Sequence, residues 1–250
     1  MLKDVREDVR LSEKTKPVAE MNVEKFQKRS IAESIQNADG IPVIAEIKRA
    51  SPSAGNLKPN ADIVLVAEQM VRGGAVALSV LTEQKHFKGD PNFLTLLRET
   101  TRVPLLRKDF IVSDYQIYEA ADLGADAVLL IAKVLGKDLW KLMVVAEDIG
   151  LECLVEVENE DEVELAESVG ASFIGINNRD LDTLEVDLGR TERLAPLISD
   201  STTLVSESGM NSPADVRKAI DAGADAVLVG TAIMRSNDIE KAVRFLVNAG

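Results

Sequence analysis

A carboxylate and an ammonium lie two residues apart in the short apolar run VIAEIKRASPS, residues 43–53. In a β-strand these side chains alternate between two faces, so Glu46 and Lys48 share one face about 6.6 Å apart, at roughly 3.3 Å per residue. The other face carries only aliphatic side chains. An apolar face and a Ser-Pro-Ser turn favour a buried strand that opens into a cavity, and an edge-strand salt bridge is the alternative. In a cavity, the pair could transfer protons.

Polar residues of the same kind end several later apolar runs. They are Lys108, Glu156, Asn177, Arg179, Glu207 and Ser208. Alternation places the charges of Lys108, Glu156 and Glu207 on the same strand faces as aliphatic residues. Burial of unpaired charges there would be prohibitively costly, so we expect a mutually compensating cluster. Such a cluster favours catalysis, and a purely structural network is the alternative.

The elements that must position these residues follow an alternating strand and helix pattern after Gly40. Gly-Ala pairs begin at Gly74, Gly124, Gly170 and Gly223, with separations of 50, 46 and 53 residues. Each separation is about two βα units long, so the sequence predicts eight strands. The expected strands are 43–48, 76–81, 104–108, 127–132, 152–157, 172–177, 203–207 and 226–230.

Eight such units predict a single (β/α)8 TIM barrel over residues 41–250, and an open doubly wound sheet is the less favoured alternative. Residues 1–40 are charged and mildly amphipathic and lack a strand pattern. We expect them to form an N-terminal helical extension packed on the barrel. Active sites of such barrels lie at the C-terminal ends of the strands, where the polar residues above fall.

Two glycine-containing turns, SESGM and LVGTA, follow the last two expected strands. Backbone N–H groups in such turns can receive a phosphate group, which makes Gly209, Gly230 and Thr231 candidate phosphate-binding residues. Lys48 could add its charge, because the first strand neighbours the last when the barrel closes. The alternative is that glycine merely permits the turns.

Four apolar residues, Phe87, Phe110, Leu129 and Leu181, are also expected near the strand ends. Each on its own would more often pack in the core or in a loop. Together they suit a planar aromatic group held between cationic side chains. Trp140 is expected in the core, on an apolar helix face.

Composition excludes several classes of protein. The net charge of -13 disfavours nucleic acid and anionic membranes as partners. The lone cysteine, Cys153, excludes an intramolecular disulfide and a Cys-rich metal site, and we expect it to face the helices and to be inert. Without a membrane-length apolar run, a signal sequence, a His pair or a Walker-type loop, we expect a cytoplasmic protein with no metal and no nucleotide cofactor.

The segments VIAEIKRASPS, LTEQKHFKGD, LLRKDFIV, LVEVEN, IGINNRDL and VSESGM occur in this order. Over roughly residues 40–235 the chain resembles the indole-3-glycerol phosphate synthase family of tryptophan biosynthesis. The resemblance implies a (β/α)8 barrel that acts as a carboxy-lyase. It would close the indole ring of 1-(2-carboxyphenylamino)-1-deoxyribulose 5-phosphate with loss of carbon dioxide and water. Residues 1–40 show no motif of the family.

The resemblance also implies roles for individual residues. Lys108 would be the general acid toward the ketone oxygen, and Glu156 would manage the later proton removal. Lys48, paired with Glu46, would contact the substrate carboxylate or phosphate and could also serve as an acid. The remaining matched positions would bind the glycerol chain, the intermediate or the anthranilate ring, and they are Ser51, Asn177, Arg179, Glu207 and Ser208.

The expected partner is therefore a small anionic sugar phosphate, and we expect a monomer. Two other functions fit a barrel with lysines at its strand ends. One is a Schiff-base aldolase, because such lysines can form imines with phosphorylated ketones. The other is a non-catalytic barrel that binds a sugar phosphate.

Overall fold

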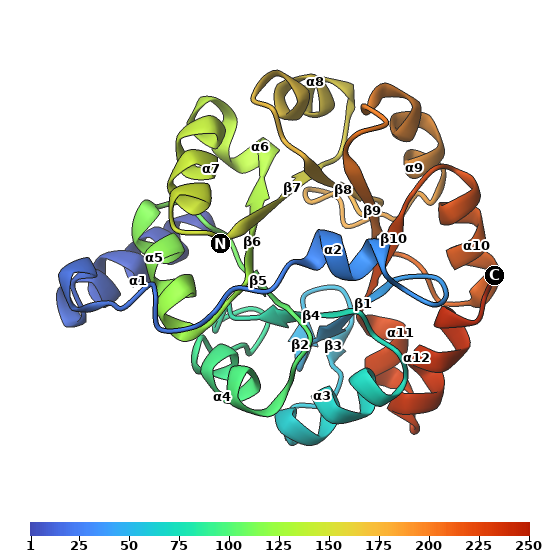
Figure 1. Ribbon diagram of the computed structural model, residues 1–250, viewed down its shortest axis with the longest axis horizontal. Helices are drawn as coiled ribbons and strands as arrows, with labels where there is room; N and C mark the ends of the chain where they lie inside the picture. The colour runs from blue at the N-terminus through green and yellow to red at the C-terminus, as the bar shows by residue number, and fades with distance from the viewer.

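Eight parallel strands close into a barrel at the centre of the computed structural model, which describes residues 1–250 (Figure 1). Around the barrel the strand order is β1, β10, β9, β8, β7, β6, β5 and β4. The strands are β1 Val43–Ile47, β4 Ala77–Leu81, β5 Leu105–Lys108, β6 Ala127–Ile131, β7 Glu152–Val157, β8 Phe173–Asn177, β9 Thr203–Glu207 and β10 Ala226–Val229. The predicted barrel and its eight strands are confirmed, with ends that agree to within a residue.

Helices surround the barrel, as Figure 1 shows. They are α3 Ile63–Arg72, α4 Asn92–Thr100, α5 Asp114–Leu123, α6 Ala132–Leu135, α7 Leu139–Asp148, α8 Glu160–Ser168, α9 Gly189–Leu194, α10 Pro213–Asp221, α11 Thr231–Arg235 and α12 Ile239–Val247, with the 3-10 turns η2 Gly136–Asp138 and η3 Ala195–Leu197. A short hairpin of β2 Ala50–Ser51 and β3 Gly55–Asn56 follows β1. Side-chain caps at Asp62, Ser113, Asn159, Ser212 and Asp238 accept backbone N–H groups and fix where five of these helices begin.

The Gly-Ala pairs occupy the connection from helix to strand. Gly74, Gly124, Gly170 and Gly223 all have positive φ, between 78° and 105°. This left-handed conformation ends a helix and is costly for any residue with a Cβ. The recurring pair therefore marks the same corner in four of the βα units, which is why it could be read as a repeat.

The hydrophobic core has two parts. A cluster of 50 buried residues lies between the strands and the helices, and a separate cluster of 13 fills the barrel interior. The inner cluster contains Ile44, Leu106, Leu154 and Val205, which share strand faces with the charged residues farther along each strand. The floor of the barrel is therefore aliphatic, and the charged side chains lie above it, at the C-terminal ends.

The N-terminal segment contains α1 Leu2–Thr15, η1 Val18–Glu20 and α2 Ile31–Gln36. Helix α2 lies across the end of the barrel that faces the viewer in Figure 1. Its Ile31 and Ile35 join the inner cluster beside Phe173, the first residue of β8, so α2 closes the barrel at the N-terminal ends of the strands. Helix α1 packs on α5.

Three carboxylates hold this segment to the barrel through its backbone. Asp122 accepts the N–H of Asn22, Asp126 accepts that of Arg29, and Glu152 accepts that of Ile31. Asp126 is 1% exposed and also accepts two hydrogen bonds from Arg98 at 2.7 Å and the Leu105 N–H at 2.9 Å. One carboxylate thus ties the N-terminal segment, α4 and β5 together.

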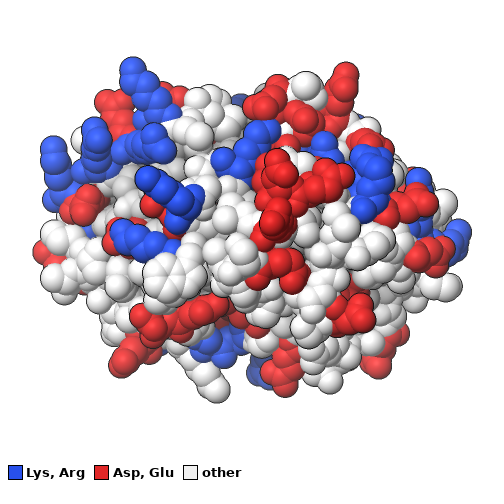
Figure 2. All heavy atoms as spheres, turned by 90° about the horizontal axis from the view of Figure 1, so that it is seen from above, with Lys and Arg blue, Asp and Glu red and all other residues white.

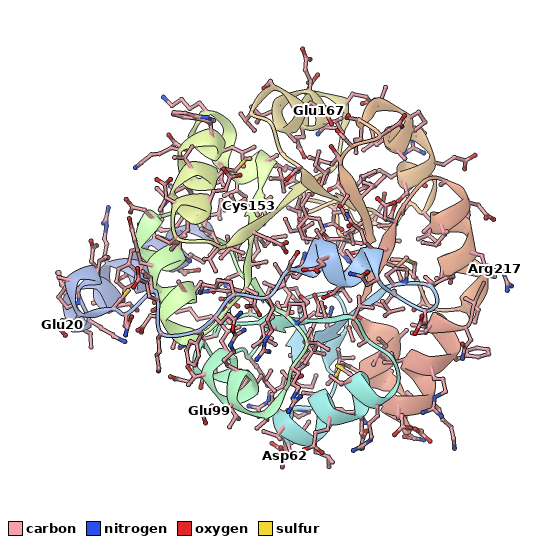
Figure 3. The ribbon with its side chains drawn as sticks, in the orientation of Figure 1. Glu20, Asp62, Glu99, Cys153, Glu167 and Arg217 are labelled. Carbon is pink, nitrogen blue, oxygen red and sulfur yellow. The ribbon has the colours of Figure 1, made fainter.

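The prediction for Trp140 is wrong, because this side chain is 60% exposed. Helix α7 buries Leu139, Leu142, Met143 and Ala146 instead, and Trp140 lies on the face that turns away from the barrel. Cys153 is buried between β7 and the helices (Figure 3), and burial raises the pKa of its thiol to about 12, as expected of an inert thiol.

On the side shown in Figure 2, acidic side chains are interspersed with lysines and arginines. No helix is both long and apolar enough to cross a membrane.

Asp126→Asn should lower the free energy of unfolding by about 3 kcal/mol, because it leaves the buried guanidinium of Arg98 without its counter-charge. Urea denaturation measures this. Asp148→Asn is the control, since Asp148 is exposed at the end of α7, and it should change stability by less than about 0.5 kcal/mol. Equal urea midpoints for the two variants would show that Asp126 does not stabilise the packing of the N-terminal segment on the barrel.

Candidate active site

A cavity of about 840 Å³ opens at the C-terminal ends of the barrel strands. Every site residue predicted from the sequence lines it. These residues are Glu46, Lys48, Ser51, Phe87, Lys108, Phe110, Leu129, Glu156, Asn177, Arg179, Leu181, Glu207, Ser208, Gly209, Gly230 and Thr231. The eight strands thus bring together side chains that are far apart in the sequence.

Five of these residues form a charge cluster, which we define as Glu46, Lys48, Lys108, Glu156 and Glu207. Lys108 Nζ lies 2.7 Å from Glu156 Oε2 and 2.5 Å from Glu207 Oε2. Lys48 Nζ lies 2.6 Å from Glu46 Oε1. The three carboxylates are nearly inaccessible, and the two lysines are largely covered. The expected compensating cluster is therefore present in the structure.

Barrel geometry explains how these charges meet. Glu46, Lys108, Glu156 and Glu207 come from β1, β5, β7 and β9, which are alternate strands around the barrel. In such barrels, alternate strands contribute the side chains of one interior layer. The charge cluster is thus the uppermost layer, directly above the aliphatic floor.

Two glycines leave the space that this layer needs. A Cβ on Gly175 of β8 would lie 2.1 Å from Glu207 Oε1, and one on Gly230, just after β10, would lie 2.3 Å from Glu46 Oε1. Neither approach is possible for a larger residue without moving the carboxylate. Gly230 was predicted as a phosphate-binding residue, and what the structure shows is that it makes room for Glu46.

The cluster contains three carboxylates and two ammonium groups, so its charges do not balance when all are ionised. Burial disfavours the Lys108 ammonium, but Glu156, Glu207 and Glu46 outweigh this effect and raise the pKa of Lys108. Burial raises the pKa of Glu207 to about 7, helped by Glu156 and Glu46 and opposed by Lys108. Glu207 Oε1 is buried without a hydrogen-bond partner. Lys108 is therefore protonated at neutral pH, and Glu207 is the carboxyl group whose pKa is raised into the neutral range.

Asn177 orients the second carboxylate of the cluster. Its side-chain amide donates to Glu156 Oε1 at 3.0 Å, and its carbonyl oxygen accepts the Arg179 N–H at 3.0 Å. With Lys108 on the other oxygen, Glu156 is held from both sides. These two contacts fix the direction of the Glu156 carboxylate at the wall of the cavity.

Phe87 and Phe110 form one side of the cavity, which we call the aromatic wall. Their ring centroids are 6.4 Å apart with a tilt of 46°. Leu129 belongs to the inner aliphatic cluster and also lines the cavity. The apolar residues predicted at the mouth are thus in place beside the charge cluster.

The connection that follows β8 supplies Arg179 and Leu181. Arg179 donates through Nη1 to the Leu184 carbonyl at 2.7 Å, and the Leu181 N–H donates to Glu158 Oε1 at 3.1 Å. Arg179 makes no ion pair with a carboxylate of the chain. Its charge is therefore free to meet an anion in the cavity.

The two glycine-containing turns predicted after the last strands both reach the cavity. Ser208 and Gly209 follow β9 with φ of 66° and 85°, and a Cβ on Gly209 would lie 2.4 Å from Val186 Cγ1. Gly230 precedes Thr231, which begins α11 after β10. A left-handed serine is uncommon, and such backbone strain often occurs at functional sites.

Sequence reasoning missed several lining residues, including Glu83, Asp109, Lys133 and Arg235. Lys133 Nζ lies 2.8 Å from Asp182 and 3.4 Å from Glu158. Glu83, Asp109 and Lys133 each follow a strand end by one or two residues, so the signal used for Lys108 could have found them. Met1 and Leu2 of the N-terminal segment also line the cavity, and no sequence pattern indicated this.

A sequence model of the family described as indole-3-glycerol phosphate synthase matches residues 1–246. This match includes the N-terminal segment, in which no motif of the family was recognised. A protein of that name from Thermoanaerobacter pseudethanolicus is 42% identical over 246 residues, covering 98% of this chain and 95% of the relative. Another from Methanopyrus kandleri is 44% identical over 240 residues, covering 93% and 94%.

Among solved structures, thiamine phosphate pyrophosphorylase from Pyrococcus furiosus superposes with a TM-score of 0.65. It is 18% identical in sequence, and the match covers 88% of this chain and 97% of that one. At this identity the likeness concerns the barrel fold alone.

Glu207→Gln should become more stable relative to the unmodified protein as the pH rises from 5 to 8. With its pKa raised, Glu207 binds more protons in the folded than in the unfolded state between about pH 4.5 and 7, so its contribution to stability falls across this window as the pH rises. The glutamine cannot ionise, so its contribution to stability does not fall as the pH rises. Urea denaturation at both pH values measures it.

Glu164→Gln, at an exposed position of α8, is the control and should show no such trend. A Glu207→Gln difference that is the same at pH 5 and pH 8 would contradict the raised pKa.

Proposed function

The chain belongs to the indole-3-glycerol phosphate synthase family of tryptophan biosynthesis, and from this premise we propose how its cavity works. The substrate, 1-(2-carboxyphenylamino)-1-deoxyribulose 5-phosphate, would lie between the aromatic wall and the turns after β9 and β10. There its indole ring would close with loss of carbon dioxide and water. The single observation that carries the proposal is the ammonium of Lys108 held between Glu156 and Glu207.

Lys108 is the general acid of ring closure in this proposal. As the ring carbon that bears the carboxylate attacks the ketone carbon, the ketone oxygen gains negative charge, and the Lys108 ammonium donates a proton to it. Its two carboxylate partners keep Lys108 protonated before the reaction. The new carbon–carbon bond places the carboxylate on a non-aromatic carbon, and loss of carbon dioxide returns the electron pair to the ring.

Glu156 serves the dehydration that follows. The hydroxyl group formed from the ketone leaves as water with a proton from an ammonium, while Glu156 removes a proton from the carbon skeleton. Asn177 fixes the orientation of Glu156, and Glu46 pairs with Lys48, which is the second cation of the cluster. General acid–base catalysis of this kind contributes typically about 10²- to 10⁴-fold.

We propose that the phosphate binds at Gly209, Gly230 and Thr231, with Lys48 nearby. Support comes from the position of both turns on the same cavity as the charge cluster and from the place of β1 beside β10 in the barrel. Loops after the last two strands of TIM barrels frequently bind phosphate.

The anthranilate ring would then contact the aromatic wall, Leu129 and Leu181. Arg179 would face its ring or carboxylate, because this guanidinium has no carboxylate partner in the chain. The remaining predicted contacts, Ser51 and Ser208, lie on the same cavity and would bind the glycerol chain or the intermediate. An anion at each end and a planar ring between them match this distribution of groups.

An aldolase that forms an imine requires a neutral lysine amine as nucleophile. The raised pKa of Lys108 works against that chemistry and favours the role of a proton donor. The reaction as proposed needs no cofactor.

We propose further that residues 1–40 act as an extension to the barrel of residues 41–250. It closes the barrel floor with α2 and borders the cavity with α1. A monomer in the cytoplasm, where amino-acid biosynthesis takes place, completes the proposal.

Lys108→Ala and Glu156→Gln should each lower kcat by at least about 10²-fold, the scale for loss of a general acid or base. The assay adds the carboxyphenylamino substrate to purified protein and follows indole fluorescence. Lys137→Ala, at an exposed lysine outside the cavity, is the control and should retain activity. Unchanged turnover in both active-site variants would refute the assigned roles.

A further inference from the structure

Glu83 is a buried carboxylate that faces the cavity and has no cationic partner. It lies two residues after β4, is 6% exposed and lines the cavity. Its side chain accepts three consecutive backbone N–H groups. Oε1 accepts that of Lys85 at 3.2 Å, and Oε2 accepts those of His86 at 2.7 Å and Phe87 at 3.0 Å.

A carboxylate at this place carries two costs. Burial without a counter-ion is unfavourable, and a negative charge beside a cavity for anions weakens their binding. The three N–H groups offset the first cost, because charge-assisted hydrogen bonds to backbone donors are strong. The unfavourable effect on anion binding remains. A carboxylate at this place is therefore expected only if it stabilises another feature of the cavity.

Glu83 stabilises the turn that contains Phe87. The Gly89 N–H donates to the Glu83 carbonyl at 2.8 Å, and Lys88 between them adopts a left-handed φ of 53°. A Cβ on Gly89 would lie 2.4 Å from the Leu81 carbonyl oxygen, so the turn folds back tightly onto the end of β4. Glu83 is the centre of this turn, and Phe87 is the last residue that its side chain holds.

Phe110, the other residue of the aromatic wall, is fixed in a similar way. Asp109 Oδ1 accepts the Phe110 N–H at 2.8 Å, and Arg107 lies 3.1 Å from Asp109 Oδ2. Asp109 therefore has a cationic partner, whereas Glu83 depends on the backbone of the turn alone. For this reason, the orientation of Phe87 is more sensitive to substitution than that of Phe110.

We propose that Glu83 is a positioning residue that sets Phe87 against Phe110 and thereby selects an aromatic ring at this end of the cavity. The inference rests on the proposed function for the identity of the ring. Glu83 acts through Phe87 and takes no part in proton transfer.

The test compares Glu83→Gln with Gln84→Ala, an exposed neighbour in the same turn. The glutamine replaces one acceptor oxygen with a donor that opposes the turn's N–H groups. We expect KM for the carboxyphenylamino substrate to rise about tenfold, the scale of one charge-assisted hydrogen bond, with kcat within about twofold. Gln84→Ala should leave both constants unchanged. An equal KM in Glu83→Gln and the unmodified protein would overturn the proposal.

Two probes separate positioning from general damage without any need for turnover. Anthranilate binding, followed by NMR titration, should weaken in Glu83→Gln, while binding of inorganic phosphate should not change. Loss of both would indicate a disturbed cavity and contradict the proposal. Absence of turnover in the unmodified protein, with anthranilate binding still dependent on Glu83, would defeat the proposed function and leave this inference standing.

A double-mutant cycle gives the sharpest readout. If Glu83 acts through Phe87, adding Glu83→Gln to Phe87→Ala should produce no further rise in KM. Additive effects would contradict the proposal. Should Glu83→Gln fail to fold, Glu83→Asp keeps the charge but shortens the reach, and it should raise KM by a smaller factor in the same direction.

Discussion

The structure depends on mutual compensation of charges inside the barrel. Lys108 is placed among carboxylates from alternate strands, above a floor of aliphatic side chains. None of these groups would be stable there alone, because burial of an isolated charge costs far more than one hydrogen bond returns. Together they hold the Lys108 ammonium and orient Glu156, although these side chains are largely buried. Burial raises the pKa of Glu207, and the neighbouring carboxylates Glu156 and Glu46 add to this effect.

Other features of the fold serve this layer. Gly175 and Gly230 leave room for two of its carboxylates, and α2 closes the opposite end of the barrel. Backbone groups are fixed by carboxylates at both ends, by Asp126 at the floor and by Glu83 at the mouth. In this acidic protein, buried carboxylates therefore act repeatedly as acceptors that hold loops and the N-terminal segment in place.

Much of this could be predicted because the sequence patterns are local. Strand alternation put Glu46, Lys108, Glu156 and Glu207 on inward faces, and the repeated Gly-Ala corner gave the number of units.

The contacts of residues 1–40 could not be predicted, because Asp122, Asp126 and Glu152 are recognised as anchors only when the segment is seen beside them. Trp140 was misplaced because its helix buries the neighbouring face. Gly230 was interpreted from its backbone alone, and its role beside Glu46 depends on the closure of the barrel, which places β10 next to β1.

The most direct test is a crystal structure with a substrate analogue in which the ketone is reduced to an alcohol, so that the ring cannot close. We expect the alcohol oxygen about 3 Å from Lys108 Nζ, within hydrogen-bond distance. We also expect the phosphate at Gly209 and Gly230 and the aryl ring against Phe87 and Phe110. An analogue bound with its alcohol away from Lys108, or with its phosphate at the aromatic wall, would contradict the proposed role of Lys108 as the proton donor.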